Sequence, residues 1–498
     1  MNKVNNLIAS ANKIVNHAGV WIGEKVEGAK NTMTSCVAAL VLLTGLAGCE
    51  KNPADSNFDK GMSAGSLAAL SCVDTVSIPV DANGIITIPT LTSDKLWKLN
   101  GVSYVKDGQT LTIDPGTTII TGRTKTYNDP THGSRSIAGV LVVAKGGKLI
   151  ANGTAAAPIV FTSPSAGGCG SGCSNAGAFG GVVLLGKAPT NRTVATTIEG
   201  VPQPSGVDLT YGGPGNNIAN DNSGSLKYVR IEFAGYRLDT DNEINGLTLG
   251  GVGTGTTLSH IQVSYSADDA FEFFGGTVNA DHLVAIGTDD DDFDFDFGYT
   301  GTIDYAIGLK DPSSTNSTSG GNSDSNGIES DNDGSGSSAS PRTEPVLRHV
   351  TLLGYENTST KLRNGNRWRR ATDLDIQYSI IGGFPTGVLF ESAPTIASAG
   401  KFTNNVVHAF STVFSGATPA GNSSGTNVSA NAYLQLGFGD ELSFLTCSNA
   451  SSFNVEDLIP STSSPAYGSA TTYKGALQPG LTPWTNGWTK FNPGFCCN

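Results

Sequence analysis

The amino-acid sequence predicts an all-β fold, a right-handed parallel β-helix with coils of about 22 residues and loop insertions. Short runs of β-branched and aromatic residues end repeatedly in glycine, proline or asparagine, which is the pattern of strands joined by turns. One motif, DDAFEFFGG at residues 268–276, returns as DDDFDFDFG at residues 290–298, 22 residues later. A fixed period of this size, with two or more short strands per period, is typical of one coil of a solenoid.

The first residues of the chain carry a processing signal. Lys30 precedes an apolar run at residues 37–48, and this run is too short to span a bilayer as a helix. It ends in LAGC at residues 46–49, which resembles the end of a bacterial lipoprotein signal peptide. We therefore expect residues 1–48 to be a signal peptide with a long n-region, and Cys49 to be acylated after cleavage. An ordinary secretory signal with an incidental cysteine is the alternative.

The chain that would remain after cleavage is acidic. It has 26 basic and 41 acidic residues, a net charge of −15, which argues against nucleic acid as a partner. A lipid on Cys49 would make the membrane its partner and place the protein in the cell envelope, as a surface-exposed or extracellular outer-membrane lipoprotein. Residues 49–65 are polar and contain proline, so we expect a flexible tether before a β-helix at residues 66–430.

Six cysteines follow Cys49, an even number in a chain routed to an oxidising compartment, so the sequence predicts disulfide bonds. Cys169 and Cys173 could close a short loop, and Cys447 could pair with Cys496 or Cys497, while Cys72 has no assigned partner. The connectivity stays open, because sequence does not choose among the pairings. Residues 431–498 are expected to hold the final coils and a cap, with Trp484 and Trp488 covering the apolar end of the last coil.

One series of strands has phenylalanine or aliphatic residues on its inner face and polar residues on its outer face. Alternation along a strand assigns the faces, because successive side chains point to opposite sides. The inward residues are Phe271, Phe273, Phe293, Phe295, Ile328 and Val388. The outward residues Thr248, Glu272, Asp294 and Glu329 are expected to lie one above another, about 4.8 Å apart.

A second series of strands is expected to place histidines and acids in an outward column. In this series Ile261, Val263, Leu283, Ala285, Tyr305 and Ile307 are predicted to face inward. The outward column is predicted to contain Tyr228, His260, His282, Asp304, His349 and Asp375. Neighbouring imidazoles could hold a transition metal, although outward positions of a solenoid are also commonly polar without one.

Several motifs resemble a family of secreted or lipid-anchored β-helix proteins that is frequent in Bacteroidota. They are LTIDPGTTI, GGKLIANGTAAAPIVFTS, VSYSADDAFEFFGGTVNADHLVAIGTDDDDFDFDFGY, NGIESDNDGSG, SPAYGSA and WTNGWTKFNP, and the similarity covers residues 91–493. The family has no settled activity, so the resemblance implies the fold and the location more than the function. Its wider kin, the pectin-lyase-like β-helices, include polysaccharide lyases, polysaccharide hydrolases and adhesins.

The repeated acidic motif is a candidate metal site. Two stacked carboxylates about 5 Å apart repel each other by ~3 kcal/mol at an effective dielectric constant of about 20. A hard divalent cation such as Ca²⁺, which binds six to eight oxygens, would relieve this repulsion. The predicted ligands are Asp268, Asp269, Glu272, Asp290, Asp291, Asp292, Asp294 and Asp296. A solvated acidic edge that keeps the solenoid soluble is the alternative.

A basic segment, RNGNRWRR at residues 363–370, is a candidate ligand-binding site. Its predicted ligand-binding residues are Arg363, Arg367, Trp368, Arg369 and Arg370, because arginine could neutralise a uronate and tryptophan could stack on a sugar ring. Structural ion pairs between these arginines and the acidic loops are the alternative. No lyase motif matches clearly, and any two acids in one column would satisfy the carboxylate spacing of a glycosidase, so neither activity is specifically indicated.

The sequence therefore favours a non-catalytic role. We expect an envelope-exposed binding, adhesion or scaffold protein with a Ca²⁺-stabilised acidic face, whose partners are a polysaccharide or cell-surface glycan and which could self-associate. The low-complexity loops at residues 310–327 and 331–344 would border that face and help to form a binding surface. A polysaccharide lyase or a glycoside hydrolase acting at the acidic groove is the alternative.

Overall fold

The structure is a computed structural model that describes residues 75–493, apart from gaps at 130–132, 138, 165–175, 240–241, 315, 320, 427, 439–443 and 447–448. The expected signal peptide, the tether, the lipidation site Cys49 and every other cysteine of the chain lie outside the described residues. Lipidation and disulfide pairing therefore stay predictions. Within the described ranges, no helix is long and apolar enough to cross a membrane.

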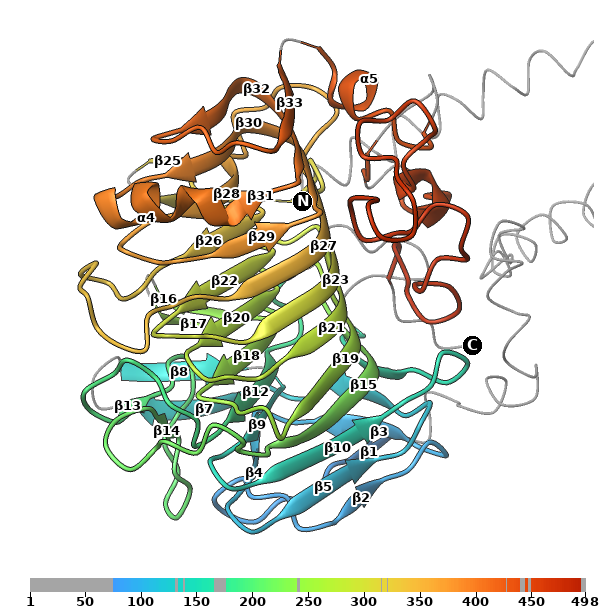
Figure 1. The fold of residues 1–498 in the computed structure, drawn as a ribbon. Coiled ribbons are helices and arrows are strands. Elements are labelled where there is room, and N and C mark those ends of the chain that lie inside the picture. Colours follow the sequence, from blue (N-terminus) through green and yellow to red (C-terminus); the bar gives the residue numbers. More distant parts are fainter. Residues whose placement is uncertain are drawn as a thin grey trace, which may run out of the picture. The chain divides into compact units, whose positions relative to one another are not determined.

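The chain winds in successive coils that build one parallel sheet of 25 strands. The sheet is folded into three faces, and each complete coil adds a strand to each face (Figure 1). The right-handed parallel β-helix that the sequence predicts is thus confirmed. Parallel neighbours in register place each side chain about 4.8 Å from its equivalent in the next coil.

The first face carries the candidate site. It consists of β4 (Val102–Val105), β9 (Val140–Val143), β12 (Gly181–Leu185), β18 (Leu247–Gly250), β20 (Phe271–Phe274), β22 (Phe293–Asp296), β26 (Ile328–Ser330), β28 (Asn364–Trp368) and the later parts of β30 (Ile380–Phe390) and β32 (Val406–Ser415).

The second and third faces share several long strands, each bent between the two faces. The second face comprises β2 (Thr90–Leu91), β5 (Thr110–Ile113), β10 (Lys148–Asn152), the first halves of β15 (Gly224–Glu232), β19 (Thr257–Ser264), β21 (Ala280–Ile286), β23 (Thr302–Leu309) and β27 (Val346–Leu353), and then β29 (Asp375–Gln377) and β31 (Phe402–Thr403). The third comprises β1 (Thr75–Ser77), β3 (Leu96–Leu99), β6 (Thr118–Thr121), β11 (Ile159–Thr162), the second halves of those long strands, the first parts of β30 and β32, and β33 (Ser423–Thr426).

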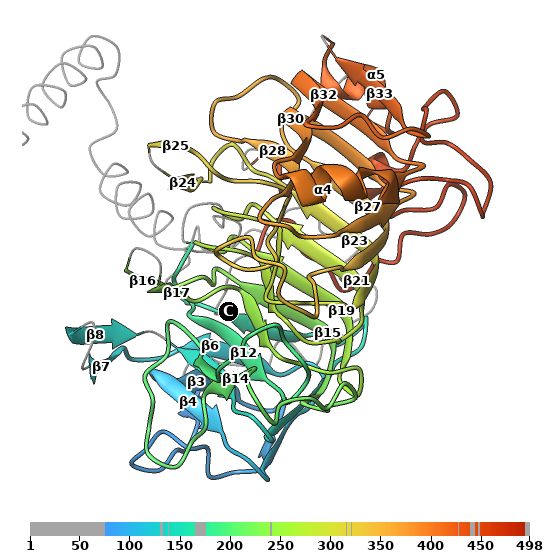
Figure 2. The ribbon, with the colours of Figure 1, turned by 60° about the vertical axis from the view of Figure 1, so that its left-hand side comes forward.

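Short elements interrupt the coils. Four small antiparallel hairpins, three of which project on one side in Figure 2, are β7 (Lys125–Asp129) with β8 (Gly133–Ile137), β13 (Thr196–Thr197) with β14 (Thr210–Tyr211), β16 (Arg237–Asp239) with β17 (Asn242–Glu243), and β24 (Thr318–Ser319) with β25 (Asn322–Ser323). The helical elements are α4 (Ala393–Ser398), η3 (Ala399–Lys401), α5 (Ala430–Leu434) and η4 (Val455–Leu458).

The interior of the coils is a continuous apolar core. Phe271 and Phe293 stack with ring centroids 5.4 Å apart, and Phe273 and Phe295 lie 5.3 Å apart one position further along. All four are fully buried, as their alternation with acidic residues predicts. The 22-residue step between β20 and β22 is therefore a true coil period.

An aromatic ladder marks the bend between the second and third faces. Its residues have left-handed backbone angles with φ between 50° and 61°, and neighbouring rings have centroids 4.3 to 5.6 Å apart. One left-handed residue turns each strand sharply and leaves its side chain outside the coil. The ladder contains Tyr228, His260, His282, Tyr305, His349 and Tyr378.

The predicted outward column is correct at Tyr228, His260, His282 and His349 and wrong at Asp304 and Asp375. Asp304 pairs in register with Asp281, 23 residues earlier, so Tyr305 rather than Asp304 follows His282 in the ladder. Ile307 correspondingly faces outward into a second apolar cluster, not inward. Asp375 pairs with Val346 and also lies outside the ladder. The coil between β21 and β23 contains one extra residue, which a constant period of 22 does not anticipate.

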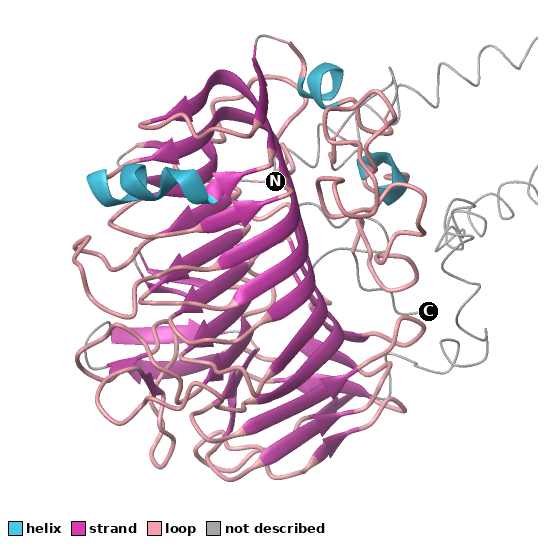
Figure 3. Cartoon of the chain, viewed as in Figure 1, coloured by secondary structure: helices cyan, strands magenta, loops and turns pink. Residues whose placement is uncertain are grey.

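The C-terminal segment covers the side of the β-helix and not its end, contrary to the sequence-based prediction of a cap. Strand β33 is the last described strand, and the segment after α5 is almost entirely loop (Figure 3). Residues 464–493, here called the strap, lie along the outer side of the third face. Trp484 and Trp488 contact the ladder at His260, more than a hundred residues before the last coil. The prediction of further coils beyond residue 430 is also wrong for the described residues.

Candidate functional site: an acidic column on the first face

Three carboxylates stack on the outer side of the first face. In FEFF, FDFD and IES the apolar residues fill the coil, so the intervening Glu272, Asp294 and Glu329 must point outward. Glu272 pairs in register with Asp294, and Asp294 pairs with Glu329. The stacking predicted from the sequence is therefore confirmed, and these three residues are called the acidic column.

The arginine segment continues the column upward. Arg367 pairs in register with Glu329 and is itself nearly buried. Its Nη1 donates to Oε2 of Glu329 at 2.8 Å and to Oδ1 of Asp324 at 3.0 Å, while its Nε donates to Oε2 of Glu391 at 2.9 Å. The upper end of the acidic column is thus neutralised from within the protein.

The remaining arginines are paired in the same way. Arg369 donates to Asp331 at 2.8 Å and also contacts Glu329, and Arg370 donates to Asp331 at 2.8 Å. Arg363 pairs with Asp324. The structure therefore brings the two candidate sites together, with the arginines of residues 363–370 acting as counter-charges for buried acids. Sequence reasoning did not identify Asp324 and Asp331 as these partners.

Trp368 does not form a sugar-stacking surface, contrary to the sequence-based prediction. It is 0% exposed, its indole donates to Oδ1 of Asn366 at 2.6 Å, and its ring packs against Phe390. Because Arg367 and Arg369 point outward on the strand, the residue between them must point inward. The alternation of Arg367, Trp368 and Arg369 in the sequence was therefore sufficient to predict that Trp368 points inward.

The lower part of the acidic column lacks such compensation. Oδ1 of Asp294 is buried without a hydrogen-bond partner. Burial, followed by the nearby Glu329 and Asp291, raises the pKa of Asp294 well above its usual value. Glu272 accepts a hydrogen bond from Asn245, yet burial and neighbouring acids still raise its pKa well above normal. Burial and Asp291 raise the pKa of Glu329 to about 8, against the effect of Arg369 and Arg367.

Two of the predicted ligands, Asp269 and Asp291, belong to a series of hydrogen bonds from side chain to backbone that joins the turns of successive coils. Oδ1 of Asp269 accepts from the backbone of Asp291 at 2.9 Å, and Oδ1 of Asp291 accepts from the backbone of Asn326 at 2.6 Å. In the next coil, Oδ1 of Asn326 accepts from the backbone of Asn364 at 3.1 Å. Each side chain thus holds the next coil in register, which leaves only the other carboxylate oxygens for a ligand.

Asp292 is not a ligand of an external ion, contrary to the prediction. Its Oδ1 lies 3.2 Å from Nζ of Lys310, and both side chains are 0% exposed. A Cβ on Gly308 would lie 2.5 Å from Asp292, so this glycine provides the room for the carboxylate inside the coil. Asp292 and Lys310 form an internal ion pair at the corner of the solenoid.

Three groups of carboxylates are close enough to share a cation. Their oxygens lie within 4.8 Å of one another in the triples Asp269, Glu272 and Asp294; Asp291, Asp294 and Glu329; and Asp268, Asp269 and Asp290. An all-oxygen donor set of this kind suits Ca²⁺, which tolerates irregular carboxylate cages. Because Glu329 already has two arginine partners, the first triple has less internal compensation than the second. Asp296 lies beyond it, where burial and Asp331 raise its pKa well above normal.

The two ladder histidines are poorly arranged for a transition metal. His260 and His282 lie beside Asp281, not beside the predicted Asp304, and Nδ1 of His282 is 2.5 Å from Oδ1 of Asp281. Their rings are stacked 4.3 Å apart at an interplanar angle of 12°. The nitrogen lone pairs lie in the ring planes and therefore run nearly parallel, so they do not converge on one ion.

A loop that carries no recognisable motif borders the acidic column. The backbone of residues 188–191 bonds to three successive coils, at Gly251, Gly276 and Phe297. This places the Arg192 guanidinium 4.3 Å from the ring centroid of Phe297. Burial and Glu272 raise the pKa of Tyr211 while Arg192 lowers it, so the loop and the column share one electrostatic environment.

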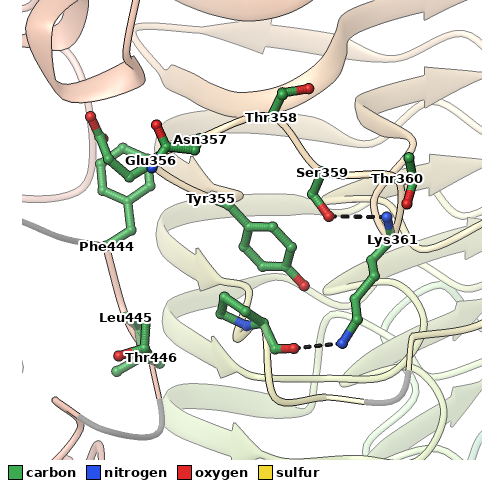
Figure 4. A pocket seen from close by; sticks show the side chains of 11 residues that line it. Tyr355, Glu356, Asn357, Thr358, Ser359, Thr360, Lys361, Phe444, Leu445 and Thr446 are labelled. Carbon is green, nitrogen blue, oxygen red and sulfur yellow. Dashed lines mark hydrogen bonds between the residues drawn. The ribbon is translucent and has the colours of Figure 1, made fainter.

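One hollow lies elsewhere on the molecule. It has a volume of about 840 Å³ and is lined mainly by residues 355–361 and 444–446, without any member of the acidic column or the arginine segment. Figure 4 shows Tyr355 at its centre and Lys361 reaching the carbonyl oxygen of Pro312, a distance of 2.6 Å.

A sequence comparison fits this architecture. Residues 85–489 match the sequence model of a family described as the pectate-lyase like beta helix domain. The chain belongs to this family. Comparisons with curated proteins and with solved structures returned no match. Membership in the pectate-lyase-like β-helix family agrees with the pectin-lyase-like resemblance of the motifs, but a shared fold does not determine an activity.

Proposed function

We propose that this pectate-lyase-like β-helix is a non-catalytic, envelope-exposed binding protein that takes up a divalent cation, Ca²⁺, on its first face and uses it to hold a glycan. The observation that carries the proposal is the buried Oδ1 of Asp294, which has no hydrogen-bond partner and lies between two further carboxylates. A cation held by Asp269, Glu272 and Asp294 would neutralise this region. Hydroxyl or carboxylate oxygens of a glycan could then complete its coordination.

The state of the arginines supports binding over lyase chemistry. A lyase needs a basic group that can remove a proton beside a carboxylate. Arg363, Arg367, Arg369 and Arg370 all form ion pairs with acids of the protein. A guanidinium in such an ion pair stays protonated and stays bound to its partner acid, so it is not free to act as a base. The arginines thus support the structural role that was the alternative in the sequence analysis.

A lipid anchor at Cys49 completes the proposal. The LAGC motif supports it, and the anchor would hold the β-helix at the outer membrane, where a glycan-binding surface has access to its ligand. Incorporation of a labelled fatty acid into the wild-type protein, and its loss in Cys49→Ser, is the expected result. Labelling that persists in Cys49→Ser would contradict the anchor.

The binding proposal is tested with uronate-containing and neutral polysaccharides, each with Ca²⁺ and with a chelator. We expect binding that the chelator and the Asp294→Asn substitution both abolish, while Asp114→Asn, at an acid after β5 in an early coil, leaves it intact. The products are analysed in parallel. New unsaturated ends would replace the proposal with a lyase and new reducing ends with a hydrolase, and chelator-insensitive binding would exclude the cation.

A further inference from the structure

The strap covers an apolar surface that a solenoid would otherwise expose. The outer side of the third face presents Val284, Ile286, Ile307, Leu309 and Leu353, all nearly or fully buried in one cluster with strap residues. Ala466, Ala476, Leu477 and Trp488 are the buried strap residues of that cluster. Most of the contact is therefore apolar and depends on exclusion of water.

A few polar contacts fix the strap in register. Gln262 exchanges two hydrogen bonds with the backbone of Lys490, at 2.6 and 2.9 Å. Arg230 donates to the carbonyl oxygen of Trp488 at 3.2 Å, and Oγ1 of Thr351 accepts from the backbone of Ala476 at 2.9 Å. These contacts are spread over several coils, so the strap joins coils that are far apart in sequence.

Histidines of the aromatic ladder lie directly beneath the strap. Trp488 and Trp484 pack edge-on against His260, at 5.6 and 6.2 Å between centroids, and Tyr473 stacks on His349 at 4.5 Å. His349 hydrogen-bonds to the backbone of Gly475, and its Nδ1 is buried without a partner. A proton added to that nitrogen would be a buried charge with no acceptor.

We propose that the strap is an acid-sensitive clamp, in which protonation of His260 and His349 releases residues 464–493 and uncovers the apolar side of the third face. This inference is independent of the acidic column. Both imidazoles are partly buried when the strap is bound, and they gain further water, and with it a greater affinity for protons, when the strap leaves. Opening therefore takes up protons, and acid favours it by mass action.

The surrounding charges decide the sign and the pH window. Burial, followed by the nearby His282, lowers the pKa of His260 to about 4, while Asp281 acts to raise it. Burial also lowers the pKa of His349. The backbone of Gly475 and the carboxylate of Asp304 act to raise that pKa, and Arg348 acts to lower it. A lowered pKa contributes stability above about 6.5 that is lost as pH falls toward 4. Burial raises the pKa of Asp304, which acts in the opposite direction. Burial also lowers the pKa of Lys474 in the strap.

The test follows strap release in the purified full chain between pH 7 and pH 4. Trp484 and Trp488 report release by a red shift of their fluorescence, and an acid-tolerant protease should cut within residues 464–493 while the β-sheet circular dichroism is unchanged. The opening equilibrium should rise about 10-fold per pH unit for each histidine that titrates.

Variants separate the histidines from other groups. His260→Phe and His349→Phe should each remove one proton from the slope, and the double variant should lose the acid-driven rise in opening and keep only the opposite effect of Asp304. Tyrosine at neighbouring ladder positions shows that an aromatic ring fits there. Asp304→Asn should shift release to higher pH, and Tyr473→Phe should leave the slope unchanged. An unaltered slope in the double variant, or fluorescence that shifts only when the β-sheet signal is lost, would overturn the proposal.

Discussion

Arg367 occupies the outward position one coil above Glu329, in the same register column in which Asp294 lies one coil below it. Glu329 is therefore placed between a positive and a negative neighbour, and its arginine contact at 2.8 Å is nearly buried. The charge sequence along the first face, acid, acid, acid and then arginine, makes the two ends of the column chemically different.

Loss of the arginine should destabilise the protein strongly. Arg367→Met leaves Glu329 with Arg369 alone and Asp324 with the more exposed Arg363 alone, and breaking a buried pair costs about 3–5 kcal/mol of unfolding free energy. Denaturant unfolding measures this loss. The double variant Arg367→Met with Glu329→Leu should recover much of it, because no unpaired charge remains, and an equally unstable double variant would show that the pair is not the cause.

Removal of the Asp294 charge should have opposite effects with and without a cation. In a chelator, Asp294→Asn should stabilise the fold, because it deletes a buried charge between Glu272 and Glu329. At a Ca²⁺ concentration about 100 times its Kd, the wild type should gain ~2.7 kcal/mol and the variant clearly less. Thermal unfolding in both buffers, with Asp114→Asn as the control, tests this. An equal Ca²⁺ effect in wild type and Asp294→Asn would count against the site.

The acidic column should also make stability depend on pH when no cation is present. The pKa of Glu329 is raised to about 8, and burial and Glu329 raise that of Asp290 to about 7. A raised pKa contributes stability that is complete below about 4.3 and is lost as pH rises through 7 and 8. The unfolding free energy should thus fall between pH 5 and pH 8, by up to ~1.4 kcal/mol per pH unit for each proton.

The contribution of these two acids is isolated by comparison with Glu329→Gln and Asp290→Asn in the same chelating buffer. The curve of unfolding free energy against pH is measured for each variant and subtracted from the wild-type curve. The subtraction cancels the contribution of the ladder histidines, which has the opposite sign. The difference should shrink when Ca²⁺ is added, because a bound cation takes the place of the protons. A difference that does not change with pH would refute the assignment.

Substitution of Trp368 should affect stability and not ligand binding. Trp368→Ala removes a fully buried ring that packs on Phe390 and Phe402, at a cost of about 3–5 kcal/mol. Trp368→Phe should cost less and should bind polysaccharide as the wild type does under conditions where both are folded. Weaker binding by folded Trp368→Phe would restore the sugar-stacking hypothesis.

The sequence was sufficient to predict the first face. Apolar and acidic residues alternate in the FEF of DDAFEFFGG and the FDFDF of DDDFDFDFG, and the two motifs lie one coil of 22 residues apart, so Glu272 and Asp294 fall into register. The prediction for the other column was right at His349 but wrong at Asp304, for the corresponding reason. One extra residue before Asp304 shifts the register by one, and only the match of Tyr305 to the aromatic character of His260 and His282 could have shown it.

Other features depend on contacts that have no period. Arg367 meets Asp324 across a loop insertion, and Trp488 meets His260 across more than two hundred residues. Neither contact leaves a pattern in the local sequence. Asp292 resembled its neighbours in the acidic run, but Lys310 and the space over Gly308 draw it into the core. Local alternation cannot distinguish such a corner residue from an exposed one.

The strap is synthesised after every coil that it covers. Until residues 464–493 have left the ribosome and any export channel, the outer side of the third face lacks the part of its cover that the strap supplies, even when every coil beneath it is complete. A chain ending before Ser464 would present a long apolar stripe to other nascent copies and should aggregate. A finished β-helix is therefore not yet a soluble one, because its solubility is acquired only when the strap has emerged and docked.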